Sequence, residues 1–131
     1  MTNDPLSNLL LDAEEIDRAS LARALQDFVG IDKATGRVVL KPGFNRLNSR
    51  QKIIAYLLGK KVAKLLNMSE SEVTSPKDIP TNTGIPIGTV HPKLRELIES
   101  RLVSQTKEGE YYIESHQILN SISSLEHKEQ K

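Results

Sequence analysis

Apolar residues recur at helical spacing in several parts of the chain, and the clearest stripe lies within residues 89–101. The stripe occupies positions i, i+4, i+7 and i+8, which are Val90, Leu94, Leu97 and Ile98. This spacing predicts an amphipathic helix. Thr89 is the expected N-cap, and Pro92 then falls in the first turn, where a missing N–H leaves no intrahelical bond unmade.

A longer apolar stripe predicts a helix over residues 49–67, with Asn48 or Ser49 as its N-cap. One face of this helix carries Ile54, Leu58, Val62, Leu65 and Leu66. The first half of the opposite face carries a second apolar patch, formed by Ile53, Tyr56 and Leu57. Such a patch needs cover, and we expect it either from residues 6–46 or from a second subunit.

Three further segments complete the helical part of the pattern. Residues 6–29 predict one or two helices that end at Gly30. Residues 75–83 predict a helix, capped by Ser75 and starting at Pro76, that Pro80 limits to little more than a turn. The last helix has its apolar positions at Ile118, Leu119, Ile122 and Leu125. It either pairs with a second copy or folds back on its own core, and the spacing favours neither.

Two hairpins separate these helices. Residues 31–40 predict one around a Lys-Ala-Thr-Gly turn at 33–36. Residues 102–105 and 111–113 have the composition of strands, and Gly109 lies in the corner between them.

The order of the elements predicts the fold. Gly84 supplies a tight turn between the short helix and the helix at 89–101, and the second hairpin follows. This order predicts a winged helix-turn-helix domain over residues 49–114, in a mostly helical α+β protein. Residues 1–48 are then a helical and β-hairpin extension packed on the core, and residues 115–131 a C-terminal helix and polar tail. The alternative is an α+β packing element of similar appearance.

The segment at 88–105 carries a family resemblance. Its sequence, GTVHPKLRELIESRLVSQ, resembles the recognition helix and first wing strand of winged-helix transcription regulators. It is similar in particular to the PadR type, whose helix commonly begins Gly-Thr-(Leu/Val)-Tyr-Pro before a leucine stripe. Gly88, Thr89, Val90 and Pro92 match this start, and His91 replaces the aromatic residue. The resemblance covers residues 49–114 and implies a DNA-binding regulator.

Charge is unevenly distributed, although the net charge is only +1. Residues 33–69 contain nine Lys and Arg residues and neither Asp nor Glu. Acidic residues gather instead near the N-terminus and in the second hairpin. A basic stretch of this kind either neutralises phosphates in a salt-dependent manner or is a solvated surface partly paired with the acidic N-terminal helix.

Candidate DNA contacts follow from the predicted helix at 89–101. Its outward or flanking residues at the start are Thr89, His91, Lys93 and Arg95. Lys93 and Arg95 are the ones able to read guanine strongly. Expected backbone contacts are Arg50, Lys52 and Lys107, and possible additional phosphate contacts are Lys60, Lys61 and Lys64. Glu96 and Glu99 also point outward, and a carboxylate facing phosphates lowers affinity.

Other classes of function find little support in the composition. The chain has no cysteine, and its three histidines are far apart in the sequence. We therefore expect no enzyme activity, catalytic residue, metal site or cofactor. The first residues lack the basic-then-apolar pattern of a signal sequence, so none is expected, and the longest apolar run, residues 53–58, is too short to span a bilayer. A soluble cytoplasmic protein is expected.

Two classes remain. The first is a transcription regulator that binds double-stranded DNA, as a homodimer formed through the C-terminal helix or the Ile53/Leu57 patch. The second is a winged-helix module that binds another protein in a larger assembly, with weak or no DNA binding.

Overall fold

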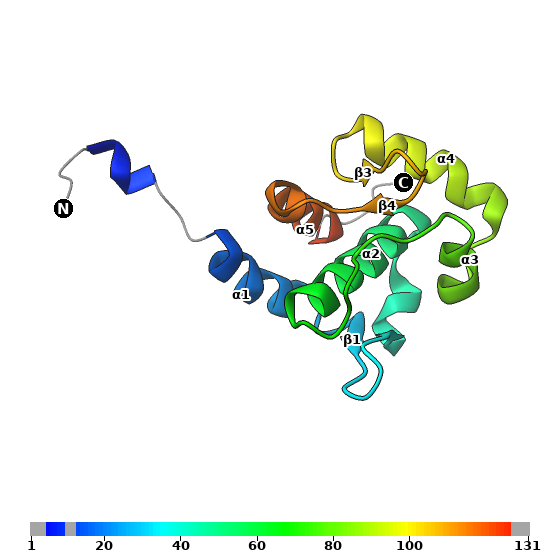
Figure 1. The fold of residues 1–131 in the computed structure, drawn as a ribbon. Coiled ribbons are helices and arrows are strands. Elements are labelled where there is room, and N and C mark those ends of the chain that lie inside the picture. Colours follow the sequence, from blue (N-terminus) through cyan, green and yellow to red (C-terminus); the bar gives the residue numbers. More distant parts are fainter. Residues whose placement is uncertain (1–4, 10–12, 127–131) are drawn as a thin grey trace.

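Figure 1 shows a computed structural model of the chain, which describes residues 5–9 and 13–126. The fold is α+β and mostly helical, with two small antiparallel sheets, as the sequence predicts at this level. The helices are η1 (Pro5–Leu9), α1 (Ala13–Leu25), η2 (Pro42–Arg46), α2 (Ser49–Leu65), α3 (Asp78–Thr83), α4 (Ile87–Glu99), η3 (Ser115–Gln117) and α5 (Ile118–Glu126). The strands are β1 (Val29–Ile31), β2 (Val38–Leu40), β3 (Ser104–Gln105) and β4 (Tyr111–Tyr112).

Helix α2 lies at the centre of the molecule (Figure 1). Asn48 is its N-cap: Asn48 Oδ1 accepts a hydrogen bond from Gln51 N (2.8 Å), and Gln51 Oε1 accepts one from Asn48 N (3.1 Å). This reciprocal capping box satisfies backbone donors that a helix start leaves open. Residues 53–59 are buried without interruption, so α2 is apolar on all sides there, as a core helix is.

The apolar patch on α2 is covered from within the chain. Ile53 is 0% exposed and Leu57 is 1% exposed, because α1, α5 and the first hairpin (β1–β2) pack around this helix. A homodimer through the Ile53/Leu57 patch is therefore wrong, since no surface is left there. Gly59 permits the hairpin's close approach: a Cβ at this position would lie 3.0 Å from Val38 Cγ1.

Helix α3 starts later than predicted. Asp78 N donates to Ser75 O (3.0 Å), so residues 75–78 form a turn, and Lys77 stands at the N-cap position. The predicted N-cap at Ser75 is therefore wrong. Pro80 falls within the first turn of α3, where its missing N–H removes no helical bond. Gly84 then takes a left-handed conformation (φ 81°) and turns the chain toward α4, as predicted.

Helix α4 starts earlier than predicted, with Pro86 rather than Thr89 as the N-cap. Thr89 N donates to Pro86 O (2.9 Å), which places Thr89 within the first turn. Pro92 consequently lies inside the helix. Since proline has no N–H, the carbonyl of Gly88 lacks its usual helical donor, and both residues are exposed to water there.

The second hairpin (β3–β4) is extended by one isolated β-bridge, which we call the Thr74 rung. Its register pairs Ser104 with Tyr112 and Gln105 with Tyr111. On the other side of β4, Thr74 exchanges both backbone hydrogen bonds with Tyr111, at 2.9 and 2.8 Å. The segment after α2 thereby joins the hairpin, in the spatial order Thr74, β4, β3.

Helix α5 folds back on the core of its own chain. Ile118, Ile122 and Leu125 are buried, whereas Leu119 is 52% exposed. Of the two alternatives for this helix, folding back is therefore the one that uses its apolar face. No helix among the described residues is both long and apolar enough to cross a membrane.

A buried polar side chain fixes the start of α5. Gln117 Oε1 accepts hydrogen bonds from Glu114 N (2.8 Å) and Ser104 Oγ (3.2 Å), and Gln117 Nε2 donates to Arg101 O (3.2 Å). Ser121 Oγ adds a bond to Leu102 O (3.0 Å). The second hairpin and α5 are thus connected by directional bonds as well as by apolar contact.

Candidate nucleic-acid interface

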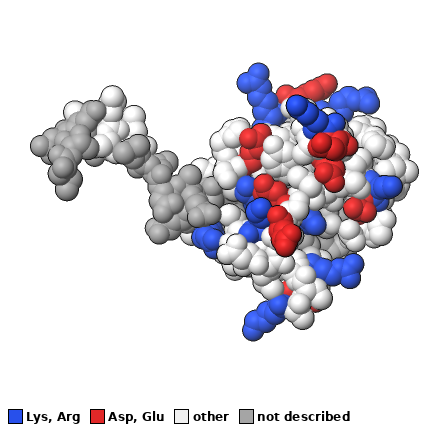
Figure 2. Space-filling view, viewed as in Figure 1, with Lys and Arg blue, Asp and Glu red and all other residues white. Residues whose placement is uncertain are grey.

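The position of α4 is set by its apolar stripe. Val90, Leu94 and Leu97 are at most 1% exposed, and they pack toward α2 and α3. The opposite side of the helix is consequently exposed, and it carries Gly88, His91, Pro92, Arg95, Glu96 and Glu99. Figure 2 shows basic and acidic side chains interspersed over the upper part of the molecule, where α4 lies. The face has no single charge sign.

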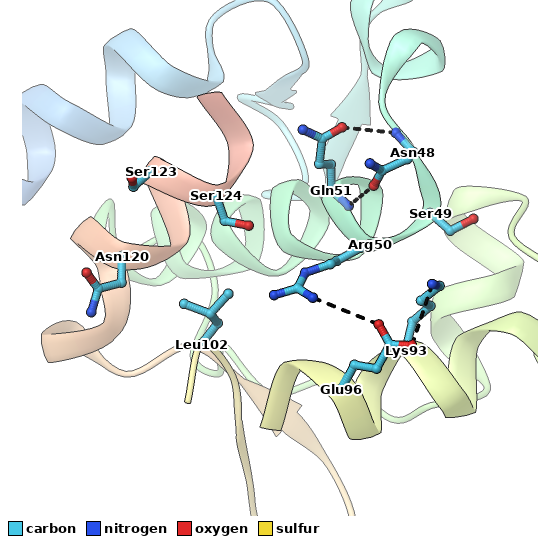
Figure 3. Close-up of a pocket in the computed structure, with 10 residues that line it drawn as sticks. All are labelled: Asn48, Ser49, Arg50, Gln51, Lys93, Glu96, Leu102, Asn120, Ser123 and Ser124. Atoms are coloured by element: carbon cyan, nitrogen blue, oxygen red, sulfur yellow. Dashed lines mark hydrogen bonds and ion pairs between the residues drawn. The ribbon is translucent and has the colours of Figure 1, made fainter. Parts of the chain in front are cut away.

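Glu96 holds two of the predicted DNA-contacting cations (Figure 3). Arg50 Nη1 lies 3.9 Å from Glu96 Oε1, and Lys93 Nζ lies 3.6 Å from Glu96 Oε2. Arg50 Nη2 also donates to Ser100 Oγ (3.4 Å). These side chains are 34–46% exposed, and ion pairs at such sites contribute little stability. Both cations can therefore exchange Glu96 for another anion at small cost.

An open cleft of about 810 Å³ lies beside this trio, between the start of α2, the flank of α4 and α5 (Figure 3). Its lining is largely polar, with Ser49 and Gln51 from α2 and Asn120, Ser123 and Ser124 from α5. The N-terminal end of α2 adds the positive end of its dipole. Sequence spacing did not indicate this cleft, because α5 reaches it only through its fold-back on the core.

The structure separates Arg50 from Lys52. Lys52 Nζ lies 5.9 Å from the centroid of the Phe44 ring, on the side of α2 that meets η2. This distance is within reach of a cation–π contact. Arg50 and Lys93 thus face one cleft, whereas Lys52 belongs to a different surface.

The three lysines near the end of α2 have different surroundings. Lys61 is buried, and its Nζ forms an ion pair with Glu72 Oε1 at 2.9 Å. The two groups are not oriented for a hydrogen bond. The predicted phosphate contact of Lys61 is therefore wrong, because the side chain is buried and paired with Glu72. Lys64 Nζ donates to Glu70 O (3.0 Å). Lys60 is half-buried.

The remaining predicted contacts lie on α4 and the second hairpin. His91 and Arg95 are exposed, and Thr89 is half-buried. Lys107 is exposed at the tip of the hairpin, next to the exposed Glu108. Arg101, which the sequence did not single out, is an exposed cation after the C-terminal end of α4, with a left-handed backbone (φ 64°).

Helix α3 is tied to α2 by a hydrogen bond beneath this face. Asn82 Nδ2 donates to Tyr56 Oη (2.9 Å). Burial of Tyr56 raises the pKa of its phenol above the ordinary value of 10.0, against the opposing effect of the Asn82 bond. The phenol is therefore neutral at physiological pH, and it fixes α3 relative to the core.

Comparison with family models, curated proteins and solved structures gives no match to this chain. Within the described part of the chain, no group of three or more His, Asp or Glu residues is arranged to hold a metal ion.

Proposed function

We propose that residues 49–114 form a winged helix-turn-helix domain that binds duplex DNA through the exposed first half of α4. The order α2, Thr74 rung, α3, α4 and second hairpin supports this fold, together with the spatial order Thr74, β4, β3. The resemblance of residues 88–105 to PadR-type regulators supports the same reading. In this domain α4 is the recognition helix and the second hairpin is the wing.

One observation carries the proposal: the first two turns of α4 are packed on one side only. Gly88, His91 and Pro92 are exposed, and a Cβ added to Gly88 would meet no atom within 4 Å. The apolar stripe on the other side holds the helix rigidly. An exposed helix start on a rigid base is the arrangement with which helix-turn-helix proteins reach base edges.

The surrounding cations have distinct roles in this proposal. Arg95 points outward from α4 and reads a base edge, with guanine as the preferred partner. Arg50 and Lys107 contact phosphates on either side and position the helix. Lys93 joins them when phosphate replaces Glu96 as its anionic partner. Binding of this kind lets the protein occupy a promoter site and regulate transcription.

A second candidate function is favoured by Glu96. Its carboxylate neutralises Arg50 and Lys93, and Glu99 adds another negative charge to the same side of α4. Ile87 is 46% exposed nearby. A surface that combines apolar and acidic groups suits a protein partner better than phosphates, and on this reading the domain is an interaction module.

Glu96→Gln separates the two candidates. The substitution keeps the size of the side chain, releases Arg50 and Lys93, and removes a charge that repels phosphate. If the domain binds DNA, affinity for a duplex should rise by about 3–10-fold, and the salt dependence should steepen by about one to two phosphate contacts. Fluorescence anisotropy at several salt concentrations measures both quantities.

Arg95→Ala supplies the complementary test, with Lys33→Ala as its matched control. Both residues are exposed cations, but Lys33 lies in the turn of the first hairpin. Arg95→Ala should weaken binding to a selected duplex by about 1–3 kcal/mol, whereas Lys33→Ala should have little effect. If neither the wild-type nor the Glu96→Gln protein binds duplex DNA at low salt, the interaction module is favoured.

A further inference from the structure

The N-terminal segment presents leucines to solvent. Leu6 is 68% exposed and Leu9 is 75% exposed, both within η1. Figure 1 shows η1 at the end of the chain, well separated from the body of the molecule. Two large apolar side chains on one short turn form a surface that binding to another surface would cover.

An apolar pocket lies on the body of the molecule, between α1, β1 and the end of α2. Its volume is about 260 Å³, and its lining is mostly aliphatic, with Leu21, Leu25, Val29, Val62, Leu65 and Leu66. Leu66 is 48% exposed. Gly30 also lines the pocket, and Val39, which is 49% exposed, lies directly across the ladder from it. The apolar surface therefore continues beyond the pocket.

The size of the pocket selects its occupant. Sites for drug-sized molecules and cofactors commonly measure about 300–1,000 Å³, and this pocket is smaller. Its walls offer mainly aliphatic contact and little hydrogen bonding to orient a polar ligand. A few apolar side chains of a peptide segment fit these properties better than a small molecule does.

Two cations border the pocket. Arg18 Nη2 donates to Leu65 O (2.8 Å), and Lys41 Nζ donates to Gln26 O (2.7 Å). Leu65 and Gln26 both line the pocket. Both of these bonds are to neutral carbonyls, so among the described residues neither bond neutralises the charge of its cation. The matching segment is apolar with acidic residues around its leucines.

The chain itself contains such a segment. Residues 1–17 include five Asp or Glu residues and neither Lys nor Arg, and Leu6 and Leu9 lie among them. We propose that the protein forms a homodimer in which η1 of each chain inserts Leu6 and Leu9 into the apolar pocket of the other. A reciprocal exchange of this kind has two-fold symmetry and closes after two subunits.

The geometry of α1 favours exchange with a second chain. The pocket lies along the C-terminal half of α1, from Arg18 onward, whereas η1 precedes the N-terminal end of this helix. In Figure 1, η1 continues away from the body rather than returning along α1. Helix η1 therefore lies away from the pocket of its own chain in this structure. This dimer does not depend on DNA binding.

The mass of the protein in solution tests the proposal. Sedimentation velocity over a range of concentrations should show the full chain converting from monomer to dimer. Leu6→Ser combined with Leu9→Ser should remain monomeric, and so should Ala22→Arg, which places a large charged side chain at an exposed position of the pocket lining. Mixing these two variants should restore a dimer that has one intact contact.

Leu119→Ser is the matched control, because Leu119 is an exposed leucine on α5, away from the pocket. It should leave the dimer intact. A wild-type protein that is monomeric at all concentrations would overturn the proposal. Loss of the dimer in Leu119→Ser but not in the Leu6/Leu9 variant would also overturn it, in favour of α5 as the interface.

Disulfide trapping distinguishes exchange from folding within one chain, and the absence of native cysteine makes it unambiguous. A Leu9→Cys protein mixed with a Leu66→Cys protein should form a crosslinked dimer on mild oxidation. Leu9→Cys mixed with Leu119→Cys should not. A crosslink that forms only within a chain carrying both Leu9→Cys and Leu66→Cys would show that η1 fills its own pocket, and the proposal would be wrong.

Discussion

The two hairpins of this protein are closed by similar turns but have different surroundings. In the first, Asp32 accepts hydrogen bonds through its side chain, and Gly36 takes a left-handed conformation (φ 77°). In the second, Thr106 Oγ1 accepts from Glu110 N (3.1 Å), and Gly109 is left-handed (φ 85°). Each turn thus pairs a polar side chain with a glycine, as short hairpins commonly do.

The difference lies in what surrounds each turn. A Cβ at Gly36 would lie 2.3 Å from the carbonyl oxygen of Met68, whereas a Cβ at Gly109 would meet nothing within 4 Å. The first hairpin is therefore part of the packed body, and the second projects its tip into solvent. Similar turn sequences can thus lie either packed against the body of the molecule or exposed to solvent.

Gly36→Ala should have the largest effect on stability. The left-handed conformation costs a residue with a Cβ about 1–2 kcal/mol, and the collision with the Met68 carbonyl adds overpacking of about 1–3 kcal/mol. We expect the free energy of unfolding to fall by about 3 kcal/mol. Urea denaturation measures it, and a loss below that of Gly109→Ala would contradict the contrast between the hairpins.

Lys61→Ala should have the next largest effect, because Glu72 lies in the segment that leads to the Thr74 rung and so anchors the second hairpin. The substitution leaves the Glu72 carboxylate without its cation. A fully buried broken pair costs about 3–5 kcal/mol, and since Glu72 is 22% exposed we expect about 2 kcal/mol. Denaturation of Lys61→Ala is compared with that of Lys60→Ala, which should change stability by less than about 0.5 kcal/mol.

Gly109→Ala isolates the cost of conformation alone. With open space around the added Cβ, the expected loss is about 1 kcal/mol, which is the left-handed strain without a collision. The same denaturation experiment measures it. A loss equal to that of Gly36→Ala would show that packing around the first turn contributes nothing.

Acid should weaken the side-chain hydrogen bonds of the first turn, because their acceptor is the Asp32 carboxylate. The Ala34 N–H, with the Thr35 hydroxyl, holds the pKa of Asp32 below its ordinary value of 3.8. Because the folded pKa is the lower one, this stabilisation is present above pH 3.8 and is lost as the pH falls below it. The effect is small because the turn is exposed. NMR shifts of Ala34 should titrate in the wild type and not in Asp32→Asn, whereas the corresponding acceptor in the second turn is the Thr106 hydroxyl, which does not titrate.

Much of the fold followed from local sequence patterns. The stripe that predicts α4, the Asn48 cap of α2 and both hairpins depend on residues close together in the chain, and the structure has these elements near the predicted positions. The starts of α3 and α4 were predicted at the wrong residues, because Pro76, Pro86 and Pro92 are each compatible with more than one helix start. The backbone hydrogen bonds of the turn before each helix set the observed starts.

The candidate site was less predictable, because its state depends on contacts between distant segments. The exposure of Arg95 follows from the period of α4. The burial of Lys61 depends on its ion pair with Glu72. The ion pair between Glu96 and Arg50 depends on how α2 crosses α4. A charge count along the sequence treats all these cations alike.

The hydrogen bonds of Gln117 have a mechanical consequence. This side chain joins the end of α4, the second hairpin and the start of α5, while the far end of α5 accepts a bond from Gln51 Nε2 at the Leu125 carbonyl (3.2 Å). Helix α5 therefore acts as a strut between the hairpin and the N-terminal cap of α2. Because α5 is one continuous helix, a shift of its hairpin end would also shift the Leu125 carbonyl, which lies beside Gln51 at the polar cleft.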